Sequence, residues 1–263
     1  MVCTSGPQDR PFEEQHSQYS VAVVLAGTFQ YRSPLGDVMM TSGSLLLGNP
    51  GQCFECGHEH AEGDRCVSFW YAADYFERLR SDAGHRGRAG FAVPRIPPLR
   101  SLAPLVARAA SSVMAPHDVS WEELAIGTAA QAVRLAGGRS GTYQPPRNAE
   151  ARVTRTVRMI DRRPDAALTL SAMAGNAGLS PYHFLRTFER LTGVTPHQYI
   201  LRARLREAAM RLTTGGVRIV DIALDCGFGD VSNFNRAFRA EFRLSPRLYL
   251  QRFGRRPIDD VAS

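Results

Sequence analysis

The sequence predicts a two-domain protein, with a first domain of short β-strands and a second domain made only of helices. Two observations indicate this division: β-type runs separated by Gly, Pro and Asp continue to about Pro98, and a helical unit occurs twice after residue 147. With 263 residues, the chain is long enough for two hydrophobic cores. The expected boundaries are 1–137 for the first domain, 138–147 for a Gly-, Ser- and Pro-containing linker, 148–256 for the second domain and 257–263 for a tail.

The first domain is expected to be a small all-β barrel or sandwich followed by helices. Its β-type runs are YSVAVVLAGTFQY (19–31), GSLLLG (43–48), CVSFWYA (66–72) and FAVPRI (91–96). Short strands at this spacing are typical of barrels and sandwiches. Helical patterns follow at 99–114, where Pro104 should kink or restart the helix, and at 120–137, which opens with the capping box of Ser120 and Glu123.

The second domain contains an internal repeat of fifty residues. When LTLSAMAGNAGLSPYHFLRTFERLTGVTPHQYI (168–200) is placed above RIVDIALDCGFGDVSNFNRAFRAEFRLSPRLYL (218–250) without a gap, five distinctive side chains coincide. The pairs are Phe184 with Phe234, Arg186 with Arg236, Phe188 with Phe238, Pro196 with Pro246, and Tyr199 with Tyr249. Such matches at one offset indicate two copies of one structural unit.

Each copy has the pattern of a short helix, a tight turn and a longer helix. In the first copy, Thr169 should cap the short helix and Ser180-Pro181 should start the longer one. In the second copy, the short helix is expected over 219–226 and Asp230 should cap the longer helix. This is a helix-turn-helix pattern, in which the second helix can lie in the major groove of DNA.

The two predicted domains differ in charge. Residues 147–256 contain 20 Arg against 9 Asp and Glu, a balance of +11, whereas residues 1–146 contain 12 Arg against 14 acidic residues, a balance of −2. A basic domain joined to a near-neutral one predicts a polyanionic partner for the basic domain. With two helix-turn-helix units in that domain, the expected polyanion is double-stranded DNA.

Composition also restricts where the protein works. No apolar run approaches the ~18 residues of a membrane span, so no membrane partner is expected. The N-terminal segment MVCTSGPQDRPFEEQHSQ does not have the pattern of a signal peptide, which predicts a cytoplasmic protein. Five cysteines, an odd number in a reducing compartment, are expected to be thiols or metal ligands rather than disulfides.

The two longer helices each have an apolar stripe and an outward face suited to reading bases. The stripes that should face the core are Phe184, Phe188 and Leu191, and Phe234, Phe238 and Phe242. The outward residues that we expect at bases are Pro181, Tyr182, Leu185, Arg186, Val231, Ser232, Asn233, Asn235 and Arg236, while Arg190, Arg239 and Arg243 suit phosphates. Asn and Arg can each make two hydrogen bonds to one purine, worth roughly 1–3 kcal/mol of discrimination.

One long helix, predicted over 196–215, joins the two copies. A rigid helix of this length can hold two recognition helices about one DNA turn apart, roughly 34 Å, on one face of the duplex. Its Arg202, Arg204 and Arg206 either contact the DNA backbone or form a solvated face.

The basic domain resembles the DNA-binding domain of the AraC/XylS transcription regulators over about residues 152–252. The most specific segments are GLSPYHFLRTFERLTGVTPHQYI and DIALDCGFGDVSNFNRAFRAEFRLSP. The resemblance implies a seven-helix domain, and it implies RNA polymerase as a partner. It implies base contacts from Tyr182, Leu185, Arg186, Val231, Ser232, Asn233 and Arg236. For residues 1–137 it implies a cupin-like barrel that binds a small effector, with dimerisation through the helices that follow the barrel.

The stretch GQCFECGHEHAEGDRC (51–66) concentrates cysteines and histidines in this sensor domain. If 52–60 is a strand, alternation places Cys56, His58 and His60 on one face, and a hairpin turn at AEGD would return Cys66 towards them. Three interpretations stay open. A Zn, Ni, Cu or Fe ion is held by Cys56, His58 and His60, with Cys66, Cys53 or Asp64 as a further ligand; or a cysteine is a reactive thiol of lowered pKa; or the strand is structural without ligand chemistry.

The sequence therefore predicts a regulator without enzyme activity, which reads two adjacent major-groove segments. A small effector or metal in the first domain would modulate a homodimer. One alternative is a metal-dependent cupin enzyme fused to a DNA-binding domain, although no second His-bearing cupin motif follows residue 66. The other is a constitutive DNA-bending protein whose barrel is inert.

Overall fold

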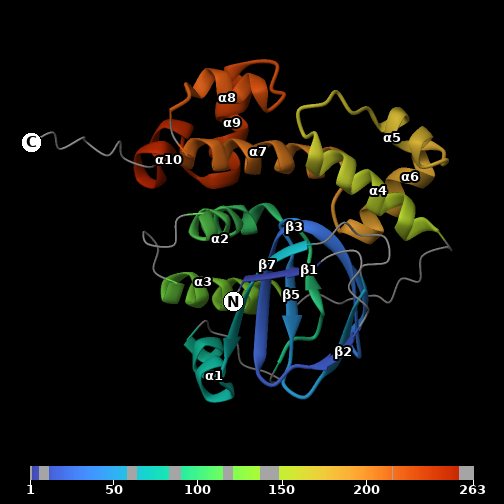
Figure 1. Ribbon diagram of the computed structural model, residues 1–263. Helices are drawn as coiled ribbons and strands as arrows, with labels where there is room; N and C mark the ends of the chain where they lie inside the picture. Colours follow the sequence, from blue (N-terminus) through green and yellow to red (C-terminus); the bar gives the residue numbers. More distant parts are fainter. Residues whose placement is uncertain are drawn as a thin grey trace, which may run out of the picture.

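The chain forms a sheet-rich N-terminal half (described residues 2–136) and a helical C-terminal half (148–254), which lies above the sheet in Figure 1. The computed structural model describes residues 2–5, 12–57, 64–82, 90–114, 121–136, 148–214 and 216–254. The strands are β1 (Val2–Ser5), β2 (Phe12–Gln15), β3 (Tyr19–Ser33), β4 (Gly36–Thr41), β5 (Leu45–Gly48), β6 (Cys53–Gly57), β7 (Asp64–Tyr71) and β8 (Arg95–Ile96).

The helices fall into two groups along the chain. In the N-terminal half they are α1 (Ala73–Asp82), the 3₁₀ turn η1 (Arg100–Leu102), α2 (Ala103–Met114) and α3 (Trp121–Leu135). In the C-terminal half they are α4 (Ala149–Arg162), α5 (Leu170–Asn176), α6 (Pro181–Thr192), α7 (Pro196–Thr214), α8 (Ile219–Asp225), α9 (Val231–Phe242) and α10 (Pro246–Phe253). Within the described residues, no helix is both long and apolar enough to cross a bilayer.

Strand β3 organises the N-terminal half because it belongs to two sheets. Its first part pairs with β5 and β7. After a bulge between Val24 and Ala26, its last part pairs with β4 and β6. A bulge bends a strand and increases its local twist, so one strand can serve both sheets. Val21 and Val23 pack towards the helices, whereas Val24 and Tyr31 belong to a second core on the other side.

The predicted barrel does not close. The strand order is β1-β7-β3-β5-β8, with β4 and β6 added to β3 and β2 added to β6, so β1 and β8 are edges in the described part of the chain. Strand β8 has only two residues because Pro94, Pro97 and Pro98 flank it, and proline has no amide donor for a longer ladder. The closed cupin-like barrel is therefore a wrong prediction, and the expected strand 91–96 is reduced to its last two residues.

The resemblance implies seven helices for the C-terminal domain alone, and the described residues contain three further helices in the N-terminal half. Ten α-helices occur in the described residues: α4 to α10 lie in the C-terminal half, and α1 to α3 cover the sheet in the N-terminal half. The helical patterns at 99–114 and 120–137 correspond to η1–α2 and to α3, and Pro104 restarts the helix as the second residue of α2. Helix α1 was not predicted, and Ser120 of the capping box lies outside the described residues.

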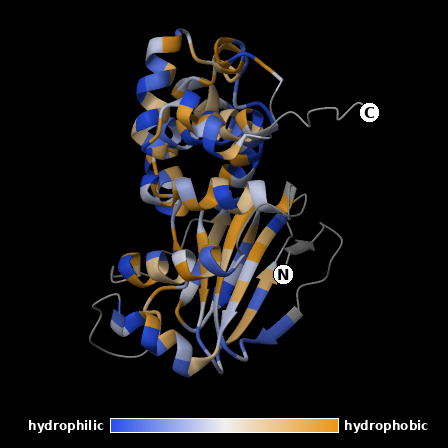
Figure 2. Ribbon diagram, turned by 90° about the vertical axis from the view of Figure 1, so that its left-hand side faces the viewer, coloured by the Kyte–Doolittle hydropathy of each residue, from blue (hydrophilic) through white to orange (hydrophobic). Residues whose placement is uncertain are grey.

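The C-terminal half has two hydrophobic cores, and both include side chains from the N-terminal half. The first core, around α4 to α6 and the start of α7, includes Met39 of β4. The second, around the rest of α7 and α8 to α10, includes Ala103 and Ala107 of α2. Figure 2 shows hydrophobic and hydrophilic residues alternating along these helices, as expected for helices with one buried face. The predicted domain boundaries stay predictions, and the expected linker and tail lie outside the described residues.

Candidate nucleic-acid interface

The first helix-turn-helix unit consists of α5, a turn and α6. The Thr169 side chain accepts a hydrogen bond from the Ala172 amide at 3.1 Å, which caps α5 as predicted. The turn contains Gly178 at φ +63°, a left-handed conformation that costs glycine least. Ser180 then accepts a hydrogen bond from the His183 amide at 3.4 Å, and Pro181 occupies the first position of α6.

The second unit repeats this arrangement with α8, a turn and α9. Asp230 caps α9 by accepting a hydrogen bond from the Asn233 amide at 2.6 Å. Gly227 has φ +83°, and a Cβ atom there would lie 2.7 Å from the carbonyl oxygen of Asp165. Only glycine fits this turn, because both the conformation and the close approach exclude a side chain.

The apolar stripes and the outward faces are as the sequence predicts. All six stripe residues are buried, and Phe184, Phe188, Phe234 and Phe238 are fully so. Ten of the twelve predicted DNA-facing residues are exposed: Pro181, Tyr182, Arg186, Arg190, Ser232, Asn233, Asn235, Arg236, Arg239 and Arg243. Leu185 and Val231 are half-buried. Both helices therefore present polar and basic groups outside a closed aromatic core.

These outward side chains include two pairs in which one residue donates a hydrogen bond to the other. On α6, Arg186 Nη1 donates to the Tyr182 hydroxyl at 3.2 Å, and the guanidinium lies 5.8 Å from the centre of the Tyr182 ring. On α9, Arg236 Nη2 donates to Asn233 Oδ1 at 3.2 Å. Such contacts between residues three or four apart reduce the rotamer freedom of each arginine before a partner arrives.

A hollow of about 820 Å³ lies beside the outward face of α9. Its polar lining residues are Asn235, Arg236, Arg239, Arg243, Ser245 and Arg247. Ser245 and Arg247 were not predicted from the sequence. The signal was present, because Ser245-Pro246 starts α10 in the same way that Ser180-Pro181 starts α6. Four guanidinium groups around one concavity attract an anion such as a phosphate.

The three arginines of α7 have structural partners instead. Arg204 donates to the carbonyl oxygens of Pro164 at 2.7 Å, Gly227 at 2.6 Å and Ala166 at 3.0 Å. Arg202 donates to the carbonyl of Pro98 at 2.5 Å. For Arg202 and Arg204, neither contact with the DNA backbone nor a solvated face is therefore the right interpretation. Their half-buried guanidinium groups join segments of the protein chain instead.

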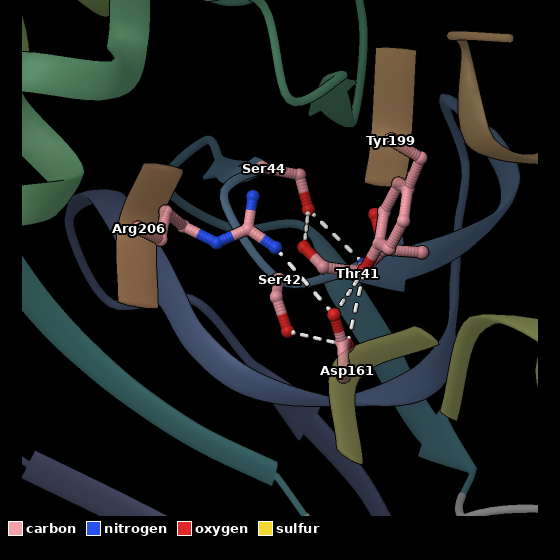
Figure 3. Close-up of polar contacts among 6 residues, drawn as sticks. All are labelled: Thr41, Ser42, Ser44, Asp161, Tyr199 and Arg206. Carbon is pink, nitrogen blue, oxygen red and sulfur yellow. Dashed lines mark hydrogen bonds and ion pairs between the residues drawn. The ribbon is translucent and has the colours of Figure 1, made fainter. Parts of the chain in front are cut away.

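Arg206 contributes to a buried polar cluster between the halves, shown in Figure 3. Asp161 of α4 accepts hydrogen bonds from Ser42 Oγ at 3.0 Å and from the Tyr199 hydroxyl at 3.1 Å, and Arg206 lies 3.5 Å away. Burial raises the pKa of Asp161 in spite of these partners. The turn between β4 and β5 is thus attached to α4 and α7.

The predicted metal ligands are only partly described. Cys56 in β6 is half-buried opposite Tyr31, and Cys66 in β7 is buried opposite Val24. Strands β6 and β7 pair with different parts of β3, so the expected hairpin between them is wrong. Cys66 Sγ donates to Asp64 Oδ2 at 3.0 Å. His58 and His60 lie outside the described residues, within which no group of three or more His, Cys, Asp or Glu suits a metal ion. The three interpretations stay predictions.

His16 is a buried polar residue that the sequence did not indicate. Its Nε2 lies 2.8 Å from the Tyr31 hydroxyl, its Nδ1 lies 3.1 Å from the Ser20 hydroxyl, and its ring stacks on Phe54 at 4.2 Å. Burial lowers the pKa of His16 to about 4, so the imidazole is neutral at physiological pH. It is a packed core group of the second sheet.

Comparison with known proteins places the helical half in one family. A family model described as "Helix-turn-helix domain" matches residues 173–252. The regulatory protein SoxS of Salmonella typhimurium is 35% identical over 96 residues, which are 36% of this chain and 90% of SoxS. The chain belongs to the AraC/XylS family of transcription regulators. This confirms the resemblance seen in the sequence.

Other relatives of this AraC/XylS chain match over smaller shares of their length. The transcriptional activator NphR of a Rhodococcus species is 38% identical over 107 residues, 39% of this chain and 31% of NphR. The transcriptional activator AarP of Providencia stuartii is 35% identical over 82 residues, 31% of this chain and 61% of AarP. The chain thus spans about a third to two thirds of these two relatives. All three relatives are regulators by name, which supports a regulator rather than an enzyme.

Solved structures similar to this AraC/XylS chain include ToxT of Vibrio cholerae O395, with 16% identity, 96% coverage of both chains and a TM-score of 0.37. The DNA-binding domain of AdpA, solved in complex with a target DNA, has 25% identity over 38% of this chain and 91% of that domain, with a TM-score of 0.37. Both TM-scores are below 0.5, so the family assignment rests on the sequence matches.

Proposed function

We propose that this protein binds double-stranded DNA in a sequence-specific manner and regulates transcription by reading two adjacent major-groove segments with α6 and α9. The observation that carries the proposal is the repeated unit. In each copy, one face of the longer helix is buried in an aromatic core. The opposite face is exposed and has residues that suit base edges. The +11 balance of residues 147–256 supplies attraction to phosphates.

The side chains divide into base readers and phosphate contacts. On α6, the base readers are Pro181, Tyr182, Leu185 and Arg186; on α9 they are Val231, Ser232, Asn233, Asn235 and Arg236. Arg190, Arg239 and Arg243 bind phosphates, and Arg247 joins them because it lines the same hollow as Arg239 and Arg243.

The N-terminal half modulates DNA binding in response to an effector, and it forms a homodimer. By linkage, an effector changes DNA affinity only if it binds two states of the protein with different affinity. The effector is either a small organic molecule or a metal ion held by Cys56, His58, His60 and Cys66. The protein acts in the cytoplasm, on promoters and together with RNA polymerase.

Metal content separates the two kinds of effector. Untagged protein purified without chelator is compared with the Cys56→Ser/His58→Ala variant by elemental mass spectrometry. Near-stoichiometric metal in the wild type that is lost from the variant supports the ion. No metal in either protein, even after reconstitution with Zn, Ni, Cu and Fe(II), leaves the organic effector.

DNA recognition is tested by selecting duplexes from a random library and titrating binding against salt, with a scrambled duplex as reference. Wild type should bind the selected duplex roughly 10³-fold or more tightly than the scrambled one. Arg186→Ala and Asn235→Ala should each lose affinity for the selected duplex, whereas the control Arg78→Ala, on α1, should not. Equal affinity for both duplexes would contradict specific recognition, because a steep salt dependence alone shows only phosphate contact.

A further inference from the structure

We propose that the segment Arg95–Arg100, here called the RIPPLR segment, sets the placement of the two recognition helices relative to each other, with Arg95 and Arg100 as positioning residues. The inference rests on the proposed DNA-binding function. It concerns residues of the N-terminal half that face the ends of α6 and α9, away from the predicted base readers.

The RIPPLR segment is fixed to the N-terminal half at both ends. Its first two residues are β8, where Arg95 and Ile96 lie opposite Leu46 and Leu45 of β5. Its last residue begins η1, which leads directly into α2. Pro97 and Pro98 restrict the backbone between these ends, because the proline ring fixes φ. A displacement of the sheet is therefore passed along a short and stiff connection.

Arg95 holds the C-terminal end of α6. Its Nη1 donates to the carbonyl oxygens of Leu191 at 2.5 Å and of Met39 at 2.7 Å. Leu191 lies in the last turn of α6, where carbonyls have no partner within the helix and a cation is favoured. Burial lowers the pKa of Arg95 to about 10, which leaves it charged at neutral pH. Pro97 also packs there, since a Cβ on Gly193 would collide with the Pro97 ring.

Arg100 holds the corresponding end of α9. Its Nε donates to the carbonyl oxygen of Ala240 at 2.8 Å and lies 3.6 Å from the carboxylate of Glu241. Glu241 is buried and also pairs with Arg202 of α7 at 3.6 Å. Arg202 in turn donates to the carbonyl of Pro98, so α7 joins the same contact.

The two contacts lie at neighbouring positions of the fifty-residue repeat: Arg95 bonds the carbonyl of Leu191, and Arg100 bonds the carbonyl of Ala240, which is one residue before the counterpart of Leu191. Glu241 is the counterpart of Leu191, so the RIPPLR segment provides one arginine for the last turn of each recognition helix. The two arginines are five residues apart on a segment that contains two prolines. Their spacing is therefore fixed, and it fixes the separation of the two helix ends as well. Since each base pair rotates a half-site by about 35° around the duplex, small changes in that separation alter which half-site spacing fits.

The test is a selection from a random 40-base-pair duplex library with the full-length protein, followed by sequencing. The variants are Arg95→Ala, Arg95→Lys and Arg100→Ala. Arg32→Ala is the matched control, because it also removes an arginine ion pair of the N-terminal half, with Glu55, on the sheet. The readouts are the two enriched half-site sequences, the distribution of spacings between them, and the Kd of the best duplex with and without one inserted base pair.

We expect wild type and Arg32→Ala to select one dominant spacing and to lose at least about tenfold in affinity on insertion. Arg95→Ala and Arg100→Ala should select the same two half-site sequences with several spacings. Their affinity should fall by less than about threefold when one base pair is inserted. Arg95→Lys, which keeps a cationic donor, should restore the dominant spacing. Arg100 is half-exposed, so Arg100→Ala and Arg95→Lys decide the question even if Arg95→Ala does not fold.

An unchanged spacing distribution in folded Arg100→Ala and Arg95→Ala would overturn the inference, whether or not their affinity falls. Such a result would mean that α7 alone sets the spacing and that the arginines serve only stability. If wild type enriches no sequence at all, the proposed DNA recognition itself fails. The two failures are thus distinguished by the wild-type selection.

Discussion

The first helix-turn-helix unit, α5–α6, and the second, α8–α9, share one interior but have different outward faces. In each unit, two phenylalanines four residues apart are fully buried: Phe184 and Phe188 in the first, Phe234 and Phe238 in the second. In each, a side-chain cap starts the longer helix. Close packing constrains the interior, because a change in the volume of a buried side chain costs stability.

Outside this core the units differ in chemistry. Helix α6 presents Tyr182, which is 62% exposed, together with Arg186. Helix α9 presents the amides of Asn233 and Asn235 beside Arg236. No packing requirement acts on these positions, so they can differ between the copies. We expect the two units to read different base sequences for this reason.

The largest effect is expected from removing the shared core. Phe238 contacts three aromatic rings, those of Phe234, Phe242 and Tyr249. Phe188 contacts the rings of Phe184 and Tyr199. Phe238→Ala and Phe188→Ala should each lower the free energy of unfolding by about 3–5 kcal/mol, with Phe238→Ala near the upper end.

Urea unfolding followed by circular dichroism measures both values. The exposed Glu189→Ala, also on α6, is the control and should change stability by less than about 0.5 kcal/mol. A loss below about 1 kcal/mol for either phenylalanine would show that its unit is not closed by this aromatic core.

The difference between the outward faces predicts unequal losses of DNA specificity. Asn235→Ala, at the counterpart of Leu185, should cost about 1–3 kcal/mol on the selected duplex, because a side chain that can bond to a purine edge is lost. Leu185→Ala should cost less than about 1 kcal/mol, since the half-buried Leu185 offers only apolar contact to a thymine methyl. Fluorescence anisotropy with base-substituted duplexes measures both. Equal losses would contradict the difference in readout between the units.

Local signals in the sequence were enough to predict the shared part of the two units. Thr169 and Asp230 cap helices through amides only three residues away, and the phenylalanine stripes follow the helical period. The α7 arginines could not be placed in this way. Arg204 bonds to the carbonyls of Pro164 and Gly227, which are 40 and 23 residues away in the chain. The helical period of the sequence indicates only that such a residue lies off the core stripe.

The N-terminal sheet was less predictable because its pairing is entirely long-range. The β-type runs were found, but the bulge in β3 and the prolines around β8 decide which strands meet and whether the sheet closes. The expected hairpin between Cys56 and Cys66 failed for the same reason. Strands β6 and β7 each pair with β3 instead of with each other.

A smaller effect should separate the ends of the two recognition helices. Both end in a left-handed residue, Gly193 at φ +81° and Arg243 at φ +63°. A left-handed conformation costs about 1–2 kcal/mol for a residue with a Cβ. Arg243→Gly should therefore raise the free energy of unfolding by up to about 1 kcal/mol, and Gly193→Ala should lower it by a similar or larger amount because of the contact with Pro97.

Arg243→Gly should also weaken DNA binding, because it removes a side chain that we propose binds a phosphate. The slope of log K against log salt for Arg243→Gly should then be about one unit shallower than for wild type. Urea unfolding and a salt titration of the selected duplex measure the two quantities. A destabilised Arg243→Gly would show that its side chain supports the fold more than its backbone conformation strains it.

The smallest effect concerns one buried position where the copies differ in charge, Glu241 against Leu191. Burial raises the pKa of Glu241, although Arg202 and Arg100 oppose the shift. The folded state therefore binds this proton more tightly than the unfolded chain does. Its contribution to stability is complete below the unfolded pKa of about 4.3 and is lost as the pH rises through the folded pKa.

Wild type should consequently gain stability relative to Glu241→Gln as the pH falls from 7 to 4, by less than about 1 kcal/mol. Leu191→Met in the first unit is the control, since neither side chain titrates and its difference from wild type should stay constant. Urea unfolding at each pH measures both differences. If wild type instead loses stability relative to Glu241→Gln on acidification, the ion pairs with Arg100 and Arg202 outweigh burial. The contact between the RIPPLR segment and α9 would then depend on the charge of Glu241, whereas the contact with α6 has no such charge to lose.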